Sequence, residues 1–539
     1  MAKQQTITEA DYIVVGAGSA GCALAARLAE SGAEVCLIEA GGGDKRNKVV
    51  TIPGGMAIMH SIPELQATLD WGFTTVPQQN ALGRTIPQTR GKILGGSSSV
   101  NGMIFVRGNR ADFDGWAADG CEGWSYEDVL PYYKRMEDWE DGANAYRGSG
   151  GPVKVTRHHA PTRATLAFVR ATSEALGVPI NDDYNAEVQE GSSLVQQNAS
   201  GRTRYSTSHA YLRGLTRPSL QVRSGLHVTK VVIDHGRATG VEMVDAKGAK
   251  SHIKARQEVI LSAGAYQSPQ LLMLSGIGPA EHLATHGIQV LADLPVGDNL
   301  HDHLFLPFTH KYADAEHIGT AGYFAKSLVK HVLGRSVWTG STLFESTAFV
   351  KTSYAGDHPD MQILNLAWAY PSPNQDEKKR HDVDPWPALT IMPTLIAPKS
   401  RGTVRLRSTD PLAAPLLDPN YFGDPDDAKV LLEGCAMVRE IMAHSGIGGS
   451  AEEVHPGLKF KGADLAEEIK NRITTVYHPV GSCRMGSDER AVVDPQLRVR
   501  GIEGLRVADA SIMPSITSGN TNAPAIMIGE KAADLVLKG

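Results

Sequence analysis

The sequence predicts an α/β protein, α+β overall, in which a mostly parallel sheet with helices is joined to a second domain built on an antiparallel sheet flanked by helices. Three observations predict this class. A strand–turn–helix–strand pattern opens the chain at residues 11–39, an apolar strand at 258–263 runs into a turn and a helix, and 301–470 contains several short strand-like segments. With 539 residues the chain exceeds one ordinary core, so two connected domains are expected.

The bulk composition excludes several functional classes. Hydrophobic residues make up 42% and charged residues 21% of the chain, as in an ordinary soluble protein. The net charge of −6, without a basic block, argues against nucleic acid as a partner. No run of eighteen or more apolar residues indicates a membrane span, and the first ten residues lack the apolar core of a signal peptide. Five scattered cysteines form neither a disulfide framework nor a zinc spacing, so a cytoplasmic protein is expected.

The opening unit has the pattern of a dinucleotide-binding fold. Gly16 allows a tight turn, Gly18 lets backbone approach a pyrophosphate, and Gly21 lets helix and strand pack closely. The helix that starts near Ser19 directs unpaired N–H groups and its positive dipole end toward the phosphates. The second strand ends in Glu39, whose carboxylate would accept hydrogen bonds from the adenosine ribose. The pattern predicts a Rossmann-like domain and leaves NAD, NADP and FAD open.

Two loops follow this unit. Residues 44–90 are irregular, as expected of a functional loop or lid, and the aromatic Trp71 is expected to anchor it. The next segment, GKILGGSSSVNGM (91–103), combines two glycines with three serines before an apolar run. Such a donor-rich turn suits a phosphate or the polar edge of a ring, so we interpret it as a cofactor loop.

The middle of the chain alternates between helix and strand patterns. Residues 112–139 read as helical with Ser125 as an N-cap, and 160–178 as a further helix. A β pattern covers 220–245, and Pro269 stands in the first turn of an expected helix over 268–275. The expected segments are a dinucleotide-binding domain at 9–155, 205–300 and 471–539, and a substrate domain at 156–204 and 301–470.

The segment VGDNLHDH (296–303) invites a metal interpretation. His301 and His303 alternate as two ligands on one strand face would, with Asp298 and Asp302 nearby. A metal site needs at least three converging ligands, and no further ligand cluster is near in sequence. We therefore expect no metal here and a structural role for both histidines.

The C-terminal part carries the candidate chemistry. A helix is expected at 424–444, with Asp424 as N-cap. His478 stands directly before Pro479, which disfavours helix and keeps the imidazole on an extended or turn segment. A short strand then ends at Asp509, and a final helix at 525–537 is expected to return to the first domain.

These motifs resemble those of the glucose–methanol–choline (GMC) oxidoreductases, which depend on FAD, over almost the whole chain. The resemblance rests on segments that occur in family order: GKILGGSSSVNGMIFVRGN (91–109), GAYQSPQLLMLSGIG (264–278), VGDNLHDH (296–303), SRGTVRLRS (400–408), YHPVGSCRMG (477–486) and GNTNAPAIMIGEKAAD (519–534). The resemblance implies that the dinucleotide is FAD.

The resemblance also implies where FAD lies. The Gly16–Glu39 unit would hold the ADP part with the Val228 backbone near adenine, the loop at 95–102 would lie beside the isoalloxazine, and Asp509 near the ribityl chain and pyrophosphate. Some members attach the flavin through a histidine just before the position of Asn101; here that residue is Val100, so non-covalent FAD is expected. The expected FAD-binding residues are Gly16, Gly18, Ser19, Gly21, Glu39, Trp71, Gly95, Gly96, Ser97, Asn101, Gly102, Val228, Asp509 and Ala510.

By the same resemblance, His478 matches the catalytic histidine and Asn522 its partner. Alcohol oxidation needs a base for the hydroxyl proton and a hydride acceptor, and a histidine near its ordinary pKa can serve as that base. Asn522 could donate a hydrogen bond to the developing alkoxide. The alternatives are a lyase on the same scaffold, like the hydroxynitrile lyases, and an NAD(P)-dependent dehydrogenase.

The expected partners are a small-molecule alcohol and an electron acceptor, which is oxygen or a quinone-type molecule. Specificity is expected in the 44–90 loop and in 301–400. The aromatic residues between Phe344 and Tyr370 would suit an aromatic or amphiphilic alcohol, and core packing explains them equally well. The motifs leave open which alcohol is the substrate, whether the enzyme is an oxidase or a dehydrogenase, and its oligomeric state.

Overall fold

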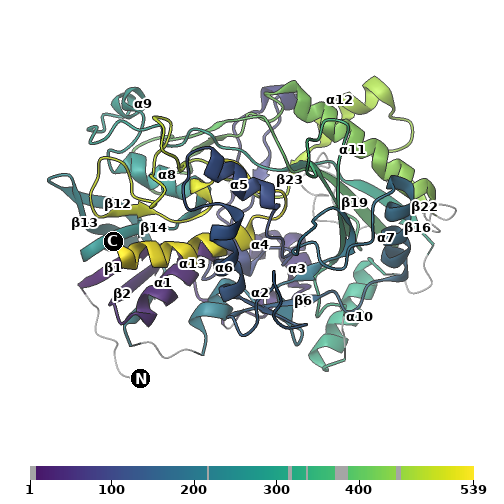
Figure 1. Cartoon of the computed structure of the whole chain (residues 1–539), viewed down its shortest axis with the longest axis horizontal. Coiled ribbons are helices and arrows are strands. Elements are labelled where there is room, and N and C mark those ends of the chain that lie inside the picture. Colours follow the sequence, from purple (N-terminus) through teal and green to yellow (C-terminus); the bar gives the residue numbers. More distant parts are fainter. Residues whose placement is uncertain are drawn as a thin grey trace.

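Two β-sheets lie toward opposite ends of the molecule, with connecting helices and loops between them (Figure 1). The structure is a computed structural model and describes residues 8–45, 47–214, 218–313, 318–335, 338–370, 386–444 and 451–539. Each sheet has a large buried hydrophobic cluster of its own. Residues 1–7, most of the segment that argued against a signal peptide, lie outside the described part.

The first sheet has seven strands in the order β11-β2-β1-β14-β13-β12, and β24 also pairs with β14. Its parallel part, β11-β2-β1-β14-β24, is the predicted Rossmann-like core. The long strand β14 pairs with antiparallel β13 in its first half and with parallel β24 in its second half. The strands are β1 Glu9–Val15, β2 Val35–Glu39, β11 Leu220–Ser224, β12 Leu226–Asp234, β13 Arg237–Asp245, β14 Lys250–Leu261 and β24 Leu505–Val507.

Close helix packing brings the two ends of the chain together on this sheet. Helix α1 (Ser19–Glu30) is rich in alanine, and α13 (Asn522–Lys538) lies alongside it (Figure 1). At their contact a Cβ on Gly529 would come within 2.3 Å of the Ala20 carbonyl oxygen, so only glycine fits. The C-terminal helix therefore packs on the helix that follows the first strand, and α13 starts at Asn522 rather than at 525.

The second sheet has eight strands and is antiparallel throughout, as predicted. Its order is β22-β16-β19-β18-β17-β7, and the short strand β15 pairs with both β19 and β23. The strands are β7 Gly191–Leu194, β15 Leu304–Phe305, β16 Phe308–Tyr312, β17 Phe344–Val350, β18 Met361–Leu366, β19 Ala388–Leu395, β22 Ala451–His455 and β23 Thr474–Thr475. One of the strand-like segments expected in 301–470 is β20 (Thr403–Arg405), which pairs with β21 (Leu416–Asp418) outside this sheet.

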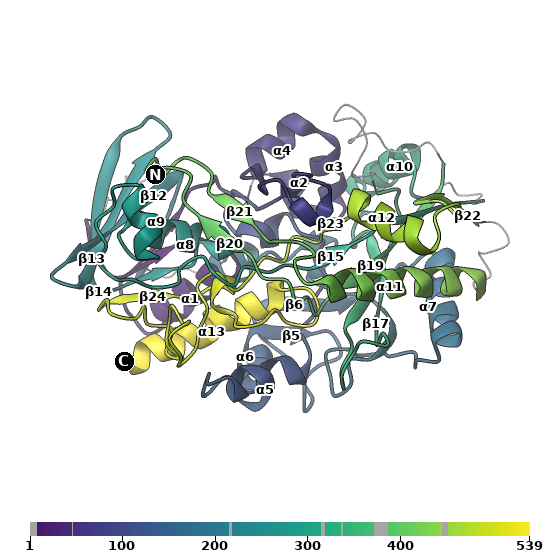
Figure 2. The ribbon, with the colours of Figure 1, turned by 90° about the horizontal axis from the view of Figure 1, so that it is seen from above.

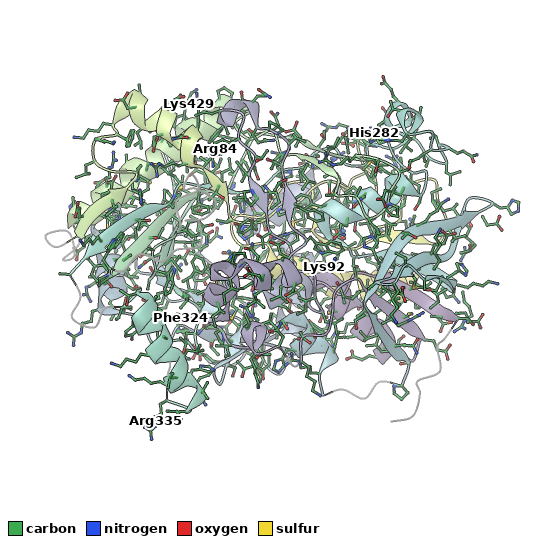
Figure 3. The ribbon with its side chains drawn as sticks, turned by 180° about the vertical axis from the view of Figure 1, so that it is seen from behind. Arg84, Lys92, His282, Phe324, Arg335 and Lys429 are labelled. Atoms are coloured by element: carbon green, nitrogen blue, oxygen red, sulfur yellow. The ribbon has the colours of Figure 1, made fainter. Side chains whose placement is uncertain are left out.

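Helices α7 (Arg163–Leu176) and α11 (Pro425–His444) pack against the second sheet, and α12 (Gly462–Arg472) packs on α11 (Figure 2). The Asp424 carboxylate accepts the N–H of Asp426 at 2.9 Å, which confirms the predicted cap. Helix α10 (Ala321–Val332) projects from the same end, and Phe324 on it is labelled in Figure 3.

The predicted lid, 44–90, contains short helices that lie between the two sheets (Figure 2). Its elements are α2 Lys48–Thr51, α3 Gly55–Ser61, α4 Pro63–Leu69, a 3₁₀ turn Gln79–Ala81, and the strand pair β3 Phe73–Thr74 and β4 Pro87–Gln88. The helix expected over 112–139 is instead two helices, α5 (Arg110–Ala118) and α6 (Tyr126–Met136), because the chain turns between them. Ser125 caps α6 as predicted.

Helix α8 (Gly264–Leu274) starts four residues before the expected position, which leaves Pro269 inside the helix rather than in its first turn. The remaining elements are β5 Glu137–Trp139, β6 Val153–Arg157, β8 Gln196–Gln197, β9 Ala199–Ser200, β10 Thr203–Arg204, α9 Ala280–Thr285, 3₁₀ turns at Gly96–Ser99 and Ala510–Ile512, and a π-helical turn at Ser208–Leu212. Among the described helices, none offers a stretch that is both long and apolar enough to span a membrane.

Candidate active site

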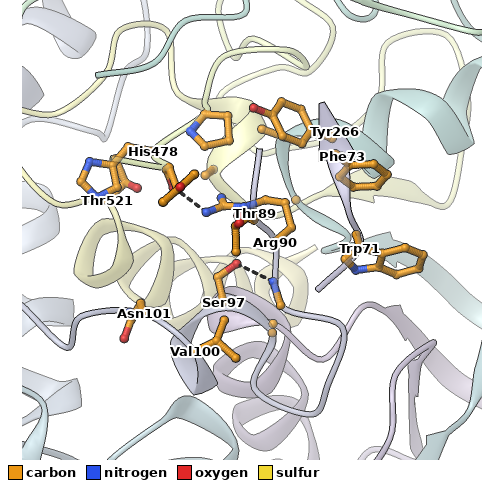
Figure 4. Close-up of a pocket in the computed structure, with 18 of the residues that line it drawn as sticks. Trp71, Phe73, Thr89, Arg90, Ser97, Val100, Asn101, Tyr266, His478 and Thr521 are labelled. Carbon is orange, nitrogen blue, oxygen red and sulfur yellow. Dashed lines mark hydrogen bonds between the residues drawn. The ribbon is translucent and has the colours of Figure 1, made fainter. Parts of the chain in front are cut away.

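A cavity of about 800 Å³ runs between the two sheets. One end is lined by the carboxyl ends of β1 and β2, and the other by residues of β17, β18 and β19. In Figure 4, Trp71 and Phe73 lie on one side of this cavity and His478 and Asn101 on the other. All fourteen predicted cofactor residues except Gly21 and Gly95 line it.

The glycine turn forms a backbone cradle at the first end. Gly16 has φ of +99°, and a Cβ on Gly21 would come within 1.9 Å of the Gly16 carbonyl oxygen. Gly96 has φ of +52°, and its Cβ would come within 2.8 Å of the Gly18 Cα atom. Gly18 is the N-cap of α1 and offers no side chain there, so the helix N-terminus opens toward the cavity. These glycines thus bring the first turn and the 91–103 loop into contact.

Glu39 stands at the end of β2 and is buried. Its Oε2 accepts the Ala17 N–H at 3.0 Å and its Oε1 accepts the Gly41 N–H at 2.7 Å. Burial raises the pKa of this carboxyl to about 7, and the backbone hydrogen bonds oppose the rise. Each carboxylate oxygen can accept more than one hydrogen bond, so both remain able to accept from ribose hydroxyls.

Aromatic side chains line the cavity beyond Glu39. Trp71 stacks on Phe73 with ring centroids 5.8 Å apart and meets the His227 ring edge-on at 5.6 Å. The Lys92 ammonium lies 4.6 Å from the centre of the Trp71 ring. The neighbouring residue Val228 also lines the cavity, so flat rings surround the place expected to hold adenine.

The 91–103 loop is held from behind by an arginine. Asn101 donates its N–H to the Ser97 carbonyl, and its Oδ1 accepts the Met103 N–H at 3.0 Å. Arg204 Nη1 donates to the carbonyl oxygen of Asn101 at 2.7 Å and to its Oδ1 at 2.9 Å. Ser97 Oγ accepts the Gly91 N–H (Figure 4). These bonds fix the backbone of Asn101 and Gly102 at the cavity surface.

Asp509 and Ala510 also line the cavity. The Asp509 carboxylate accepts the Gly264 N–H at 2.8 Å, the Ser268 hydroxyl at 2.6 Å and the Ser511 N–H at 2.8 Å. Burial raises the pKa of this carboxyl above its ordinary value, and these donors oppose the rise.

The donor set and the shape fit an extended FAD. A glycine cradle at a helix N-terminus suits a pyrophosphate, an acidic strand end suits a ribose, and a long cavity continues past it to a polar backbone loop. A Cβ on Gly96 would contact Gly18 and fill the space of the cradle. The loop around Asn101 offers backbone groups that could contact the edge of a ring.

His478 lies at the far side of the cavity, buried with 9% of its surface exposed. Its Nε2 atom is 3.3 Å from Nδ2 of Asn520. The Oδ1 of Asn520 faces the Gln362 amide on β18 at 3.2 Å. Burial, the neighbouring His303 and the Arg90 charge together hold the pKa of His478 well below its ordinary value.

The structure does not bring Asn522 to His478. The Asn522 Oδ1 accepts the Ser19 hydroxyl at 2.6 Å, which ties the start of α13 to the start of α1. Both asparagines belong to the same GNTN segment, and the turn before α13 directs the first toward His478 and the second toward α1. The GNTN motif indicated that this segment lies near His478, but nothing in the sequence indicated which of its two asparagines faces that histidine.

The segment expected to be structural, 296–303, lies directly beside His478. His303 Nδ1 is 3.0 Å from His478 Nδ1. Asp302 Oδ1 accepts the backbone N–H of His478 at 2.8 Å. Within the described ranges, no three His, Cys, Asp or Glu side chains converge as metal ligands. The sequence did not predict this contact because the two histidines are 175 residues apart along the chain.

Comparison with known proteins agrees with this geometry. Two family models, both described as GMC oxidoreductase, match residues 10–305 and 398–529. The chain is 40% identical to the oxygen-dependent choline dehydrogenase of Brucella suis, over 98% of this chain and 96% of that protein. It is 40% identical to the protein of the same name from Sinorhizobium medicae, with the same coverage.

Solved structures share the fold. Pyridoxine 4-oxidase from Mesorbium loti superposes with a TM-score of 0.85 at 27% identity, covering 98% of this chain and 100% of that one. Formate oxidase from Aspergillus oryzae, studied for its FAD modification, gives a TM-score of 0.89 at 26% identity, with 99% and 98% covered. Taken with the cavity, these matches show that the chain belongs to the GMC oxidoreductase family and is an FAD-dependent oxidoreductase acting on the CH–OH group of alcohols.

Proposed function

We propose that this enzyme oxidises an alcohol to an aldehyde or ketone, with His478 as the base that removes the hydroxyl proton. The observation that carries the proposal is the contact between His478 Nε2 and the Asn520 amide at the cavity surface, 3.3 Å apart. A base and a hydrogen-bond donor that meet at one point can bind the same hydroxyl oxygen.

The residues that line the cavity would hold FAD, which would supply the hydride acceptor that oxidation of a carbinol carbon requires. His478 takes the hydroxyl proton on Nε2 as the C–O bond becomes a carbonyl. Its lowered pKa keeps the imidazole neutral at physiological pH, which a proton acceptor requires. The Asn520 amide donates to the substrate oxygen while negative charge develops there, and Gln362 orients that amide.

We assign the partner role to Asn520 in place of Asn522. Both residues line the cavity, but the side chain of Asn522 is bonded to Ser19 and that of Asn520 faces His478. In this proposal Asn522 supports the N-terminus of α1, and hence the pyrophosphate position.

We further propose that FAD is held without a covalent bond. Val100 at the cavity surface has no nucleophilic atom. Gly16, Gly18, Ser19, Gly21, Glu39, Trp71 and Val228 would bind the ADP half, and Gly95, Gly96, Ser97, Asn101, Gly102, Asp509 and Ala510 the flavin half. Denaturation with acid tests this: free FAD in the supernatant supports the proposal, and colour retained by the protein pellet contradicts it.

The substrate end of the cavity supports an alcohol with an apolar body. Its wall includes Phe344, Leu364, Leu366, Trp368 and Met392, and the Phe305 ring meets Tyr370 edge-on at 5.5 Å. Leu364 and Leu366 share a strand face with Gln362, which places this apolar wall next to Asn520.

Anaerobic mixing of the purified holoenzyme with alcohols tests the function. The panel includes benzyl alcohol, choline and 3,3-dimethylbutan-1-ol, the uncharged carbon analogue of choline. Loss of the visible flavin absorbance with any of these supports the proposal, and an unchanged spectrum with all of them contradicts it for this group of alcohols. Parallel assays with oxygen and an artificial quinone then identify the acceptor, which we propose to be one of these two classes.

A further inference from the structure

We infer that His303 is a positioning residue that holds His478 in the tautomer a base requires, with the proton on Nδ1 and the lone pair on Nε2. The inference rests on the proposed role of His478. It changes the interpretation of His303, which the sequence indicated to be structural.

Chain geometry holds the two histidines together. Strand β15 pairs with β23, with Leu304 opposite Thr475, and His301 and Val480 exchange both backbone hydrogen bonds further along. His303 and His478 lie between these two fixed points. Their ring planes are nearly perpendicular, at 86°, with Nδ1 atoms 3.0 Å apart. That distance is a hydrogen bond, so one of the two nitrogens carries a proton and the other accepts it.

The other nitrogen of His303 decides which way this bond runs. His303 Nε2 lies 3.1 Å from the Ile396 carbonyl oxygen, which can only accept, so Nε2 carries the proton. His303 is fully buried, and burial lowers its pKa to about 3, so the ring is neutral and carries no second proton. His303 Nδ1 is therefore the acceptor, and His478 Nδ1 is the donor.

The direction of this hydrogen bond determines the protonation of the His478 nitrogen that faces the cavity. With its proton on Nδ1, neutral His478 has a bare Nε2, which faces the Asn520 amide donor and the cavity. When Nε2 takes a proton from substrate, the resulting cation keeps its Nδ1–H bond to His303. Two charged groups act on His478: Arg90, which opposes that cation, and Asp302, whose carboxylate accepts the backbone N–H of His478. Because His303 does not line the cavity, it would act on the reaction through His478.

Two substitutions separate this role from simple packing. In His303→Asn, the amide oxygen can take the place of Nδ1 and still accept from His478. In His303→Gln, the longer side chain can replace Nε2–H and reach Ile396 but offers no acceptor at the Nδ1 position. We expect His303→Gln to slow anaerobic flavin reduction by about 10- to 100-fold, part of what a general base contributes, with KM nearly unchanged. His303→Asn should keep the rate within about threefold of wild type.

For the wild type and each variant, we would measure the limiting rate of flavin reduction as a function of pH. The FAD content and the melting temperature of each protein are measured alongside. Equal rates in the two variants overturn the inference, because a packing role does not distinguish an acceptor at Nδ1 from a donor at Nε2. If both variants lose FAD, nitrogen-15 NMR of the wild-type protein determines directly which ring nitrogen of His478 carries the proton. A protonated Nε2 on neutral His478 overturns the inference. If His478→Ala reduces flavin at the wild-type rate, the proposed function itself fails.

Discussion

His478 and Asn520 face each other at 3.3 Å on the cavity surface, whereas Asn522 is turned away and bonded to Ser19. Two residues of the same short segment thus serve different ends of the cavity. The first meets the proposed base, and the second ties α13 to the helix whose N-terminus would bind the pyrophosphate.

Asn520→Ala is expected to lower the rate of flavin reduction by about 10²-fold, the usual effect of losing one donor to a developing oxyanion. Rapid mixing with a reducing alcohol measures this rate. Asn522→Ala is the matched control: it should weaken FAD retention and leave the reduction rate of the FAD-loaded fraction within about threefold. The reverse outcome, with Asn522→Ala slow in reduction and Asn520→Ala normal, would contradict the assignment.

The pH dependence of kcat/KM follows from the lowered pKa of His478. A base works only when neutral, and burial, His303 and Arg90 favour the neutral form. We expect activity to remain on its plateau down through pH 6.5, the ordinary histidine value, and to fall only below it. Arg90→Met removes one of these causes and should move the acidic limb to higher pH, while Arg90→Lys keeps the charge. An acidic limb above pH 6.5 in the wild type would contradict the proposal that His478 is the base.

FAD binding should also depend on pH, through Glu39. Its pKa of about 7 without bound FAD means that the carboxyl is partly protonated at neutral pH. Ribose hydroxyls bind the ionised form, so binding lowers the pKa and releases a proton, and affinity should rise as pH increases through 7. Titration of apoenzyme with FAD measures this. Glu39→Gln should bind more weakly and lose the dependence; a wild-type affinity that falls with rising pH would rule out this role.

Glycine-to-alanine substitutions test the backbone cradle formed by the first glycine turn. A Cβ on Gly21 would meet the Gly16 carbonyl oxygen at 1.9 Å, so Gly21→Ala must separate α1 from β1 and should abolish FAD retention. Gly115, inside α5, has nothing within 4 Å of its would-be Cβ. Gly115→Ala should therefore raise stability by about 0.5–1 kcal/mol, the helix cost of glycine, and keep FAD. Urea unfolding and the flavin spectrum of both variants measure these effects; normal FAD content in Gly21→Ala would contradict the packing.

The sequence predicted the parallel core, the antiparallel sheet and most helices because each has a local signal: apolar runs, caps and turn glycines. Helix boundaries differed where that signal was weak, as at α8, where the position of Pro269 indicated a later start. The first glycine turn and Glu39 were predictable because one short unit, residues 11–39, holds them all.

The catalytic side was predictable only in part. His478 came from a resemblance of motifs, but its neighbours depend on strand pairing between β15 and β23, which no local pattern reports. His303 looked structural for this reason. The choice between Asn520 and Asn522 depends on a turn of two residues before α13, which rotates one side chain to each end of the cavity.

In the proposed reaction, His478 removes the hydroxyl proton and so allows the alcohol to reduce the flavin. Its most direct test is anaerobic rapid mixing of wild-type and His478→Ala holoenzyme with the best alcohol of the panel. We expect the variant to bind FAD normally and to lose flavin absorbance at least about 10²-fold more slowly, as expected for a missing general base. Flavin reduction at the wild-type rate in His478→Ala would contradict it.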